Sequence, residues 1–156
     1  MRPRGDGPAR SGDEVLRRLQ DRHDFPIAAT VELTRQCNLG CRHCYLDLDG
    51  HPGLDREVIQ RLLDELREEG TLVLTFTGGE PTCRRDWLEV MEEARGRRFA
   101  VRLKTNGYRL SESEARRLAD LAVLAVDVSL YGASAATHDG VTLVEGSFDR
   151  TWKTIE

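Results

Sequence analysis

ATVELTRQCNLGCRHC, residues 29–44, joins a strand-like stretch to a cluster of cysteines. At its start the apolar Val31 and Leu33 alternate with polar side chains, which is the pattern of a strand with one buried face. The rest carries three of the chain's four cysteines, at spacings of four and three residues: Cys37, Cys41 and Cys44. The segment therefore predicts both the first strand of the fold and the place of its chemistry.

The composition is that of one ordinary soluble domain. The chain has 156 residues, of which 39% are hydrophobic and 32% charged, and a net charge of −4, which gives no sign of a nucleic-acid partner. It has no apolar run long enough for a membrane span and no secretory signal, so we expect a cytoplasmic protein. Thiols stay reduced there, which favours a metal or redox centre over disulfides.

Strand-like and helix-like segments alternate along the chain after an N-terminal region. We expect a tail and short helix in residues 1–27 and one core domain in residues 28–156. The expected strands are 29–34, 71–77, 99–104 and 121–130, and the expected helices are 55–70, 85–96, one opened by a Ser111–Glu114 capping box, and one capped by Ser147. Residues 131–146 read as a long loop, with His138 and Asp139 in a turn or cap.

Four such βα units predict an α/β fold with parallel strands and right-handed crossovers. One face of every strand is aliphatic, while the other becomes polar toward the strand's carboxyl end. We interpret this pattern as a partial (β/α) barrel whose polar face encloses a wet cleft, in contrast to the filled interior of a closed barrel. The alternative is an open sheet with one solvated face.

Three clustered thiols leave a metal centre one ligand short. Structural zinc is four-coordinate and needs a further ligand, which His43 is poorly placed to give and which Cys83 gives only if the fold brings it back. A [4Fe–4S] cluster suits the spacing better, because three thiolates hold three irons and leave the fourth iron open. Cys83 is otherwise read as a small hydrophobic residue.

The C-x3-C-x2-C spacing resembles the signature of the radical S-adenosylmethionine (SAM) superfamily. Further motifs strengthen the resemblance, each at the end of an expected strand: FTGGEP (76–81), KTNG (104–107) and VSLYGASAATHD (128–139). The resemblance implies that Cys37, Cys41 and Cys44 hold a [4Fe–4S] cluster whose open iron chelates S-adenosylmethionine. It also implies reductive cleavage of that cofactor to a 5′-deoxyadenosyl radical.

The same resemblance implies a set of cofactor-binding residues. Gly78 and Gly79 would let the backbone approach the ligand, and Glu80 would offer its carboxylate to the ligand's ammonium group. His43 matches a position near the adenine, Ser129 matches a cofactor contact on the fourth strand, and Asn106 lies in the TNG turn. Lys104, at the end of the third strand, is expected either to touch substrate or to pair with Glu32 or Asp127.

The chain offers only about four βα units, fewer than the family's core, so we expect a truncated piece of a longer protein. The fourth-strand motif is most similar to the branch that modifies peptides or builds cofactors. That branch implies a peptide or small-molecule substrate and an electron donor such as flavodoxin or ferredoxin. Two alternatives stay open: an inactive iron–sulfur-binding remnant and a zinc-binding structural module.

Overall fold

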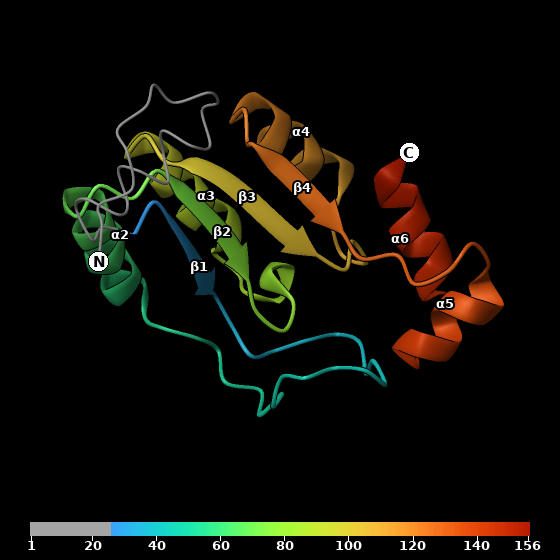
Figure 1. The fold of residues 1–156 in the computed structure, drawn as a ribbon. Helices are drawn as coiled ribbons and strands as arrows, with labels where there is room; N and C mark the ends of the chain where they lie inside the picture. Colours follow the sequence, from blue (N-terminus) through green and yellow to red (C-terminus); the bar gives the residue numbers. More distant parts are fainter. Residues whose placement is uncertain (1–25) are drawn as a thin grey trace, which may run out of the picture.

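The computed structural model describes residues 26–156, so the tail and short helix predicted for residues 1–27 lie almost wholly outside it. Its centre is a four-stranded parallel sheet in the order β1-β2-β3-β4 (Figure 1). The strands are β1 (Ala28–Glu32), β2 (Val73–Thr77), β3 (Ala100–Thr105) and β4 (Ala125–Val128). All four occur where the sequence predicts strands, and β4 is shorter than the predicted 121–130.

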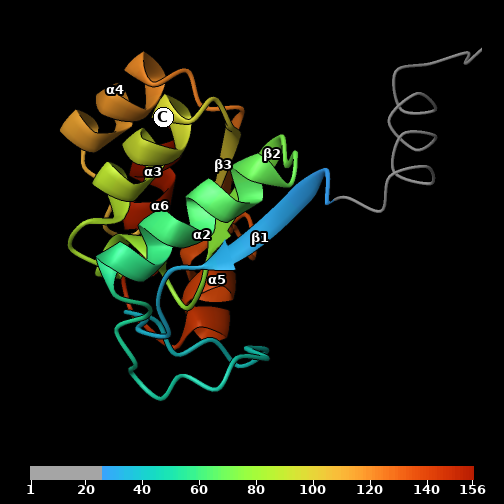
Figure 2. The same cartoon turned by 90° about the vertical axis from the view of Figure 1, so that its left-hand side faces the viewer.

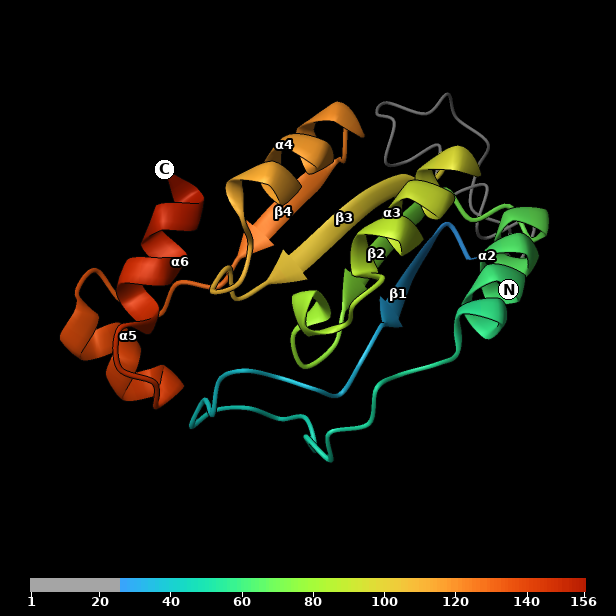
Figure 3. The ribbon, with the colours of Figure 1, turned by 180° about the vertical axis from the view of Figure 1, so that it is seen from behind.

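Helices follow each strand. They are α2 (Arg56–Glu68), the 3₁₀ turn η1 (Pro81–Cys83), α3 (Trp87–Gly96), α4 (Glu112–Asp120), α5 (Ala135–Thr142) and α6 (Ser147–Ile155). Because the strand order never reverses, right-handed crossovers place α2, α3 and α4 on the same face of the sheet (Figures 2 and 3). Helices α5 and α6 lie beyond the carboxyl end of β4. Within residues 26–156, no helix combines the length and apolar character of a membrane span.

The hydrophobic core lies between the sheet and these three helices. The aliphatic faces predicted for β2 and β3 are buried: Leu74, Phe76, Val101 and Leu103 are all fully buried. The aliphatic side predicted for the fourth strand is less covered, since Val126 is partly buried and Leu124, just before β4, is 55% exposed. The helices meet them with buried side chains, which are Ile59 and Leu63 of α2, Trp87, Val90 and Met91 of α3, and Leu118 of α4. Burial of these side chains supplies most of the driving force that holds the strands in register.

The opposite face of the sheet is polar, as predicted. Thr75 of β2 is in register with Arg102 of β3, and Lys104 is in register with Asp127 of β4. Within residues 26–156, Lys104 forms neither of the ion pairs considered for it, with Glu32 or with Asp127. Asp127 Oδ2 instead lies 3.7 Å from Arg102 Nε, and Lys104 is exposed at the end of its strand.

The capping box predicted for α4 is confirmed. Ser111 Oγ accepts from the Glu114 backbone N–H at 3.3 Å, and Glu114 Oε2 accepts from the Ser111 N–H at 2.8 Å. Ser111→Ala is expected to lower the free energy of unfolding by about 1 kcal/mol, because a helix N–H loses its acceptor. Urea denaturation measures this, with Ser111→Asp as the control that keeps an acceptor. Equal losses in both variants would contradict the prediction.

Two predictions beyond β4 are wrong. Residues 131–146, predicted as a loop, contain α5, whose N-terminus is capped by Ser134. Its residues AATHDGVT include a glycine and β-branched side chains, which lower helix propensity and hide the helix from sequence reading. Ser147, predicted as the cap of the last helix, is its first helical residue, and the acceptor comes from Asp139 of α5. Asp139 Oδ1 accepts from Ser147 Oγ and from the Phe148 N–H, both at 2.8 Å.

Asp139 makes the α5–α6 pair sensitive to acid. Desolvation raises its pKa, but hydrogen bonds from Phe148, Ser147 and Gly146 together bring the pKa below its ordinary value. A carboxyl group with a lower pKa in the folded state stabilises the fold above its unfolded-state pKa, which is about 3.9. That contribution is lost as the pH falls through the folded-state pKa.

Asp139→Asn is therefore expected to lower the free energy of unfolding at pH 7, and the difference from wild type should shrink as the pH falls below about 4. Urea titrations across this range measure it. Asp149→Asn, at an exposed position of α6, is the control and should show a smaller change. A deficit of Asp139→Asn that stays constant with pH would count against this role of the carboxylate.

Candidate functional site

A cavity of about 220 Å³ opens at the carboxyl edge of the sheet. It is lined by residues from the loops after all four strands. Every residue that the resemblance assigned to the cluster or to S-adenosylmethionine lines it: Cys37, Cys41, His43, Cys44, Gly78, Gly79, Glu80, Asn106 and Ser129. The fold thus brings together four motifs that are far apart in the chain.

The cysteine loop, residues 33–55, leaves β1, runs along this edge toward α5 and returns to α2 (Figure 1). Its three thiols are free. Burial raises the pKa of Cys37 and of Cys41, and the neighbouring Cys44 raises that of Cys41 further. Among residues 26–156, no three His, Cys, Asp or Glu side chains converge as a site for a single metal ion. A cluster does not require such convergence, because each thiolate binds a different iron.

Helix α5 holds the middle of the cysteine loop. The Gly40 N–H donates to Thr142 O and the Arg42 N–H to Val141 O, both at 3.0 Å. These carbonyls belong to the last turn of the helix, where they have no partner within the helix. The two donors flank Cys41, so the backbone around this cysteine is fixed independently of its side chain.

The loop after β2 holds the start of the cysteine loop. The Gly79 N–H donates to Thr34 O and the Glu80 N–H donates to Gln36 O, both at 2.8 Å. A Cβ at Gly78, where φ is +144°, would overlap the Thr34 carbonyl, and one at Gly79 would overlap that of Gln36. The glycines therefore permit contact between two stretches of backbone, a reason that the sequence alone does not give.

Glu80 is almost fully buried, with a relative exposure of 1%. Its Oε1 accepts from the Thr82 N–H at 3.1 Å, from the Thr82 hydroxyl at 2.8 Å and from the Thr105 hydroxyl at 2.7 Å. Its Oε2 accepts from the Asn106 N–H at 2.6 Å. A carboxylate has about four acceptor sites, and Oε2 receives only one of these bonds. The carboxylate thus joins the β2 and β3 loops while it still lines the cavity.

Asn106 lies against the cysteine loop. Its Nδ2 donates to Asn38 Oδ1 at 3.1 Å and lies 4.0 Å from Cys37 Sγ. Its Oδ1 accepts from the Tyr108 N–H at 2.9 Å, which fixes the orientation of the amide. Donors near a cysteine sulfur tune the electronics of a bound metal centre.

An aromatic row borders the cavity on the side of β4. His43 contacts the Tyr131 ring edge to face, with centroids 4.6 Å apart, and Tyr131 stacks on the buried His138 at 5.5 Å. Burial raises the pKa of the Tyr131 phenol, against a hydrogen bond with Ser129 that lowers it. The sequence predicts His138 and Asp139 in a loop turn or a cap. Both belong to α5, and Asp139 caps the start of α6, whereas His138 Nδ1 accepts from the Tyr131 N–H at 3.2 Å.

Sequence reasoning missed three residues of this region as contributors: Asn38, Thr105 and Tyr131. All three lie inside the stretches quoted from the sequence, which was the only available signal. Cys83 is half-buried, and its Sγ lies 3.6 Å from Asn38 Oδ1. Unlike the other three cysteines, it does not line the cavity. Lys104 lines the cavity and stays a candidate for substrate contact.

The four parallel strands follow one another in sequence order, and a cavity lined by three cysteines lies at their carboxyl edge. This fold and site define the class of partial (β/α) barrels with a cysteine loop after the first strand. The chain belongs to the radical SAM superfamily, because the sequence model of that family matches residues 31–156. This confirms the family that the sequence motifs indicated.

Curated relatives are enzymes that are longer than this chain. Mycofactocin maturase MftC of Mycobacterium tuberculosis is 37% identical over 136 residues, which cover 85% of this chain and 34% of the relative. The AdoMet-dependent heme synthase of Oleidesulfovibrio alaskensis is 30% identical over 156 residues, which cover 98% of this chain and 40% of the relative. The chain thus spans between a third and two fifths of the length of these relatives.

Solved structures confirm the fold class. SuiB of Streptococcus suis, bound to its precursor peptide SuiA, superposes with a TM-score of 0.75 at 18% identity, over 99% of this chain and 37% of SuiB. SuiB bound to S-adenosylmethionine superposes with a TM-score of 0.72. At this identity the likeness concerns the fold, and it confirms the partial barrel.

Proposed function

We propose that this chain forms the part of a radical SAM enzyme that binds the cluster and S-adenosylmethionine. The observation that carries the proposal is the gathering of three free thiols, the GGE loop and the strand-four residues around one cavity. Cys37, Cys41 and Cys44 would hold a [4Fe–4S] cluster. When bound, the cluster supplies the electron that cleaves S-adenosylmethionine to methionine and a 5′-deoxyadenosyl radical.

The chain's own residues would bind and orient the cofactor. Gly78, Gly79 and Glu80 line the cavity that the amino group would enter. Glu80 Oε2 receives one hydrogen bond, from the Asn106 N–H, and would accept a further one from that group. Ser129 lines the same cavity, and His43 presents a ring held by Tyr131 for the adenine. Asn106 would orient Cys37 and modulate its sulfur.

The substrate we propose is a peptide or a cofactor precursor. Support comes from the relatives: one is a mycofactocin maturase, one a heme synthase, and the SuiB structure contains a precursor peptide. A one-electron donor of the flavodoxin or ferredoxin type would reduce the cluster. The cytoplasmic location and the core domain of residues 28–156 stay predictions from the sequence.

Anaerobic reconstitution with iron and sulfide tests the proposal. The expected result is a brown protein with about four irons per chain that forms 5′-deoxyadenosine when reduced in the presence of S-adenosylmethionine. A cluster without this product would favour the inactive remnant. A single tightly held zinc ion, or no metal, would overturn the assignment of the cavity.

A further inference from the structure

The cysteine loop narrows at its base, where residues 33–35 leave β1 and residues 51–54 lead into α2. We call these two segments the neck. The Arg35 N–H donates to His51 O at 2.9 Å across it. Gly53 has a φ of +96°, and a Cβ there would overlap a carbonyl of the opposite segment. The two ends of the loop therefore touch through their backbones, with no room for a side chain at this point.

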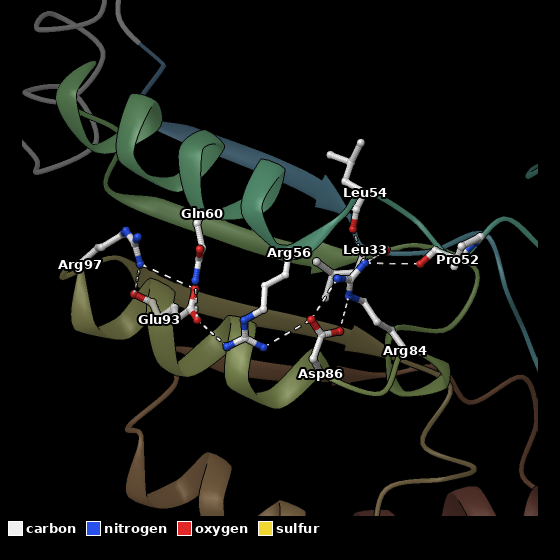
Figure 4. Close-up of polar contacts among 9 residues, drawn as sticks. All are labelled: Leu33, Pro52, Leu54, Arg56, Gln60, Arg84, Asp86, Glu93 and Arg97. Atoms are coloured by element: carbon white, nitrogen blue, oxygen red, sulfur yellow. Dashed lines mark hydrogen bonds and ion pairs between the residues drawn. The ribbon is translucent and has the colours of Figure 1, made fainter.

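One guanidinium group reaches both segments of the neck (Figure 4). Arg84 Nη1 donates to Leu54 O at 2.6 Å, and it lies 3.4 Å from Pro52 O and from Leu33 O. The Arg84 side chain is only 10% exposed. Three carbonyls from the two ends of the loop thus converge on one buried cation, and hydrogen bonds to a charged group are stronger than neutral ones.

Asp86 fixes the orientation of this guanidinium. Arg84 Nη2 donates to Asp86 Oδ2 at 3.0 Å, and Arg84 Nε lies 2.6 Å from Asp86 Oδ1. Arg56, the first residue of α2, also donates to Asp86 Oδ2, at 3.4 Å (Figure 4). Desolvation raises the pKa of Asp86, but Arg84 and Arg56 together keep the pKa below its usual range. The carboxylate therefore stays charged at neutral pH and ties the neck to α2 and α3.

We propose that Arg84 is a positioning residue that closes the neck and so presents the three cysteines as one ligand set. The proposal rests on the proposed function, since it assigns Arg84 to the loop that would bind the cluster. A lysine carries one compact ammonium group, which cannot hold the forked contact with Asp86 and the neck carbonyls at the same time. The planar guanidinium does both.

Arg84→Gln in the full chain tests this in two ways. In the metal-free protein, hydrogen exchange of the Arg35 amide, which bonds across the neck, is expected to be at least about tenfold faster than in wild type. Exchange of the Leu124 amide, which bonds to Val101 O of β3 at 2.7 Å just before β4, should not change. In the reconstituted protein, chelator competition should show apparent iron affinity reduced by about 10–100-fold. Arg84→Lys should recover little of either loss.

Arg97→Gln is the matched control. Arg97 also joins α2 to α3, through Asp64 at 2.6 Å and Glu93 O at 3.3 Å, but it lies away from the neck (Figure 4). This variant should leave both the Arg35 exchange rate and the iron affinity at wild-type values. Equal effects of Arg97→Gln and Arg84→Gln would overturn the proposal, as would wild-type behaviour of Arg84→Gln.

Asp86→Asn is the variant that tests the proposal if Arg84→Gln does not fold. It removes the charge that orients Arg84 and leaves the guanidinium in place, so Arg35 exchange should again become faster, by a smaller factor. Unchanged exchange in this variant would refute the role of the pair. The exchange measurement needs no cluster, so it tests the role of Arg84 separately from the proposed function. If the wild-type protein bound no iron, the proposed function would be wrong. The role of Arg84 in closing the neck would then be decided by the exchange rates of the Arg35 amide.

Discussion

Cys41→Ala is expected to abolish cluster binding and leave the fold intact. The variant should retain less than about a tenth of the wild-type iron after anaerobic reconstitution, because one of three thiolate ligands is lost. The fold should survive because the backbone on both sides of Cys41 is held by α5, through bonds that do not involve its side chain. Iron analysis and urea denaturation of the same samples measure the two effects.

Cys83→Ala is the control for this result. Cys83 is also a half-buried free thiol, and burial raises its pKa as it does those of Cys37 and Cys41. Its Sγ contacts Asn38 and does not line the cavity, so the variant should keep its iron. Loss of iron from Cys83→Ala, or full iron in Cys41→Ala, would show that the ligand set is assigned wrongly.

The sheet and the location of the site could be predicted because both depend on local patterns. Alternating apolar residues marked each strand, and the capping box of Ser111 and Glu114 marked the start of α4. Parallel strands place their carboxyl ends at one edge, so motifs that follow successive strands must meet there. The cysteines, the GGE loop and the TNG turn lie together for this reason.

The contacts that organise the site could not be predicted, because they join residues that are far apart in the sequence. Arg84 reaches Leu33, 51 residues away, and Thr105 reaches Glu80 across 25. No local periodicity reports such partners. Helix α5 was missed for a related reason: its sequence favours a helix weakly, and its stabilising contacts are distant in the sequence. It packs against α6, and its last carbonyls accept hydrogen bonds from the cysteine loop.

Glu80 raises the question of whether a motif residue serves the ligand or the fold. Its carboxylate accepts four hydrogen bonds from Thr82, Thr105 and Asn106, and two of the donors are backbone N–H groups. Truncation to alanine leaves both N–H groups buried without an acceptor. At about 1–3 kcal/mol for each, Glu80→Ala is expected to lower the free energy of unfolding by about 2–6 kcal/mol. Urea denaturation of the metal-free protein measures this without any cofactor.

Glu80→Gln keeps the shape of the side chain and exchanges one acceptor oxygen for a donor, so a loss of about 1–3 kcal/mol is expected. Glu92→Ala is the control: its carboxylate pairs with Arg117 at the surface, and its removal should cost less than about 1 kcal/mol. If Glu80→Ala were as stable as Glu92→Ala, the four contacts would contribute little and Glu80 would act mainly on the ligand. A large loss of stability would instead mean that Glu80 shapes the cavity by joining the β2 and β3 loops, since only a folded pair of loops can present Gly79 and Asn106 to it.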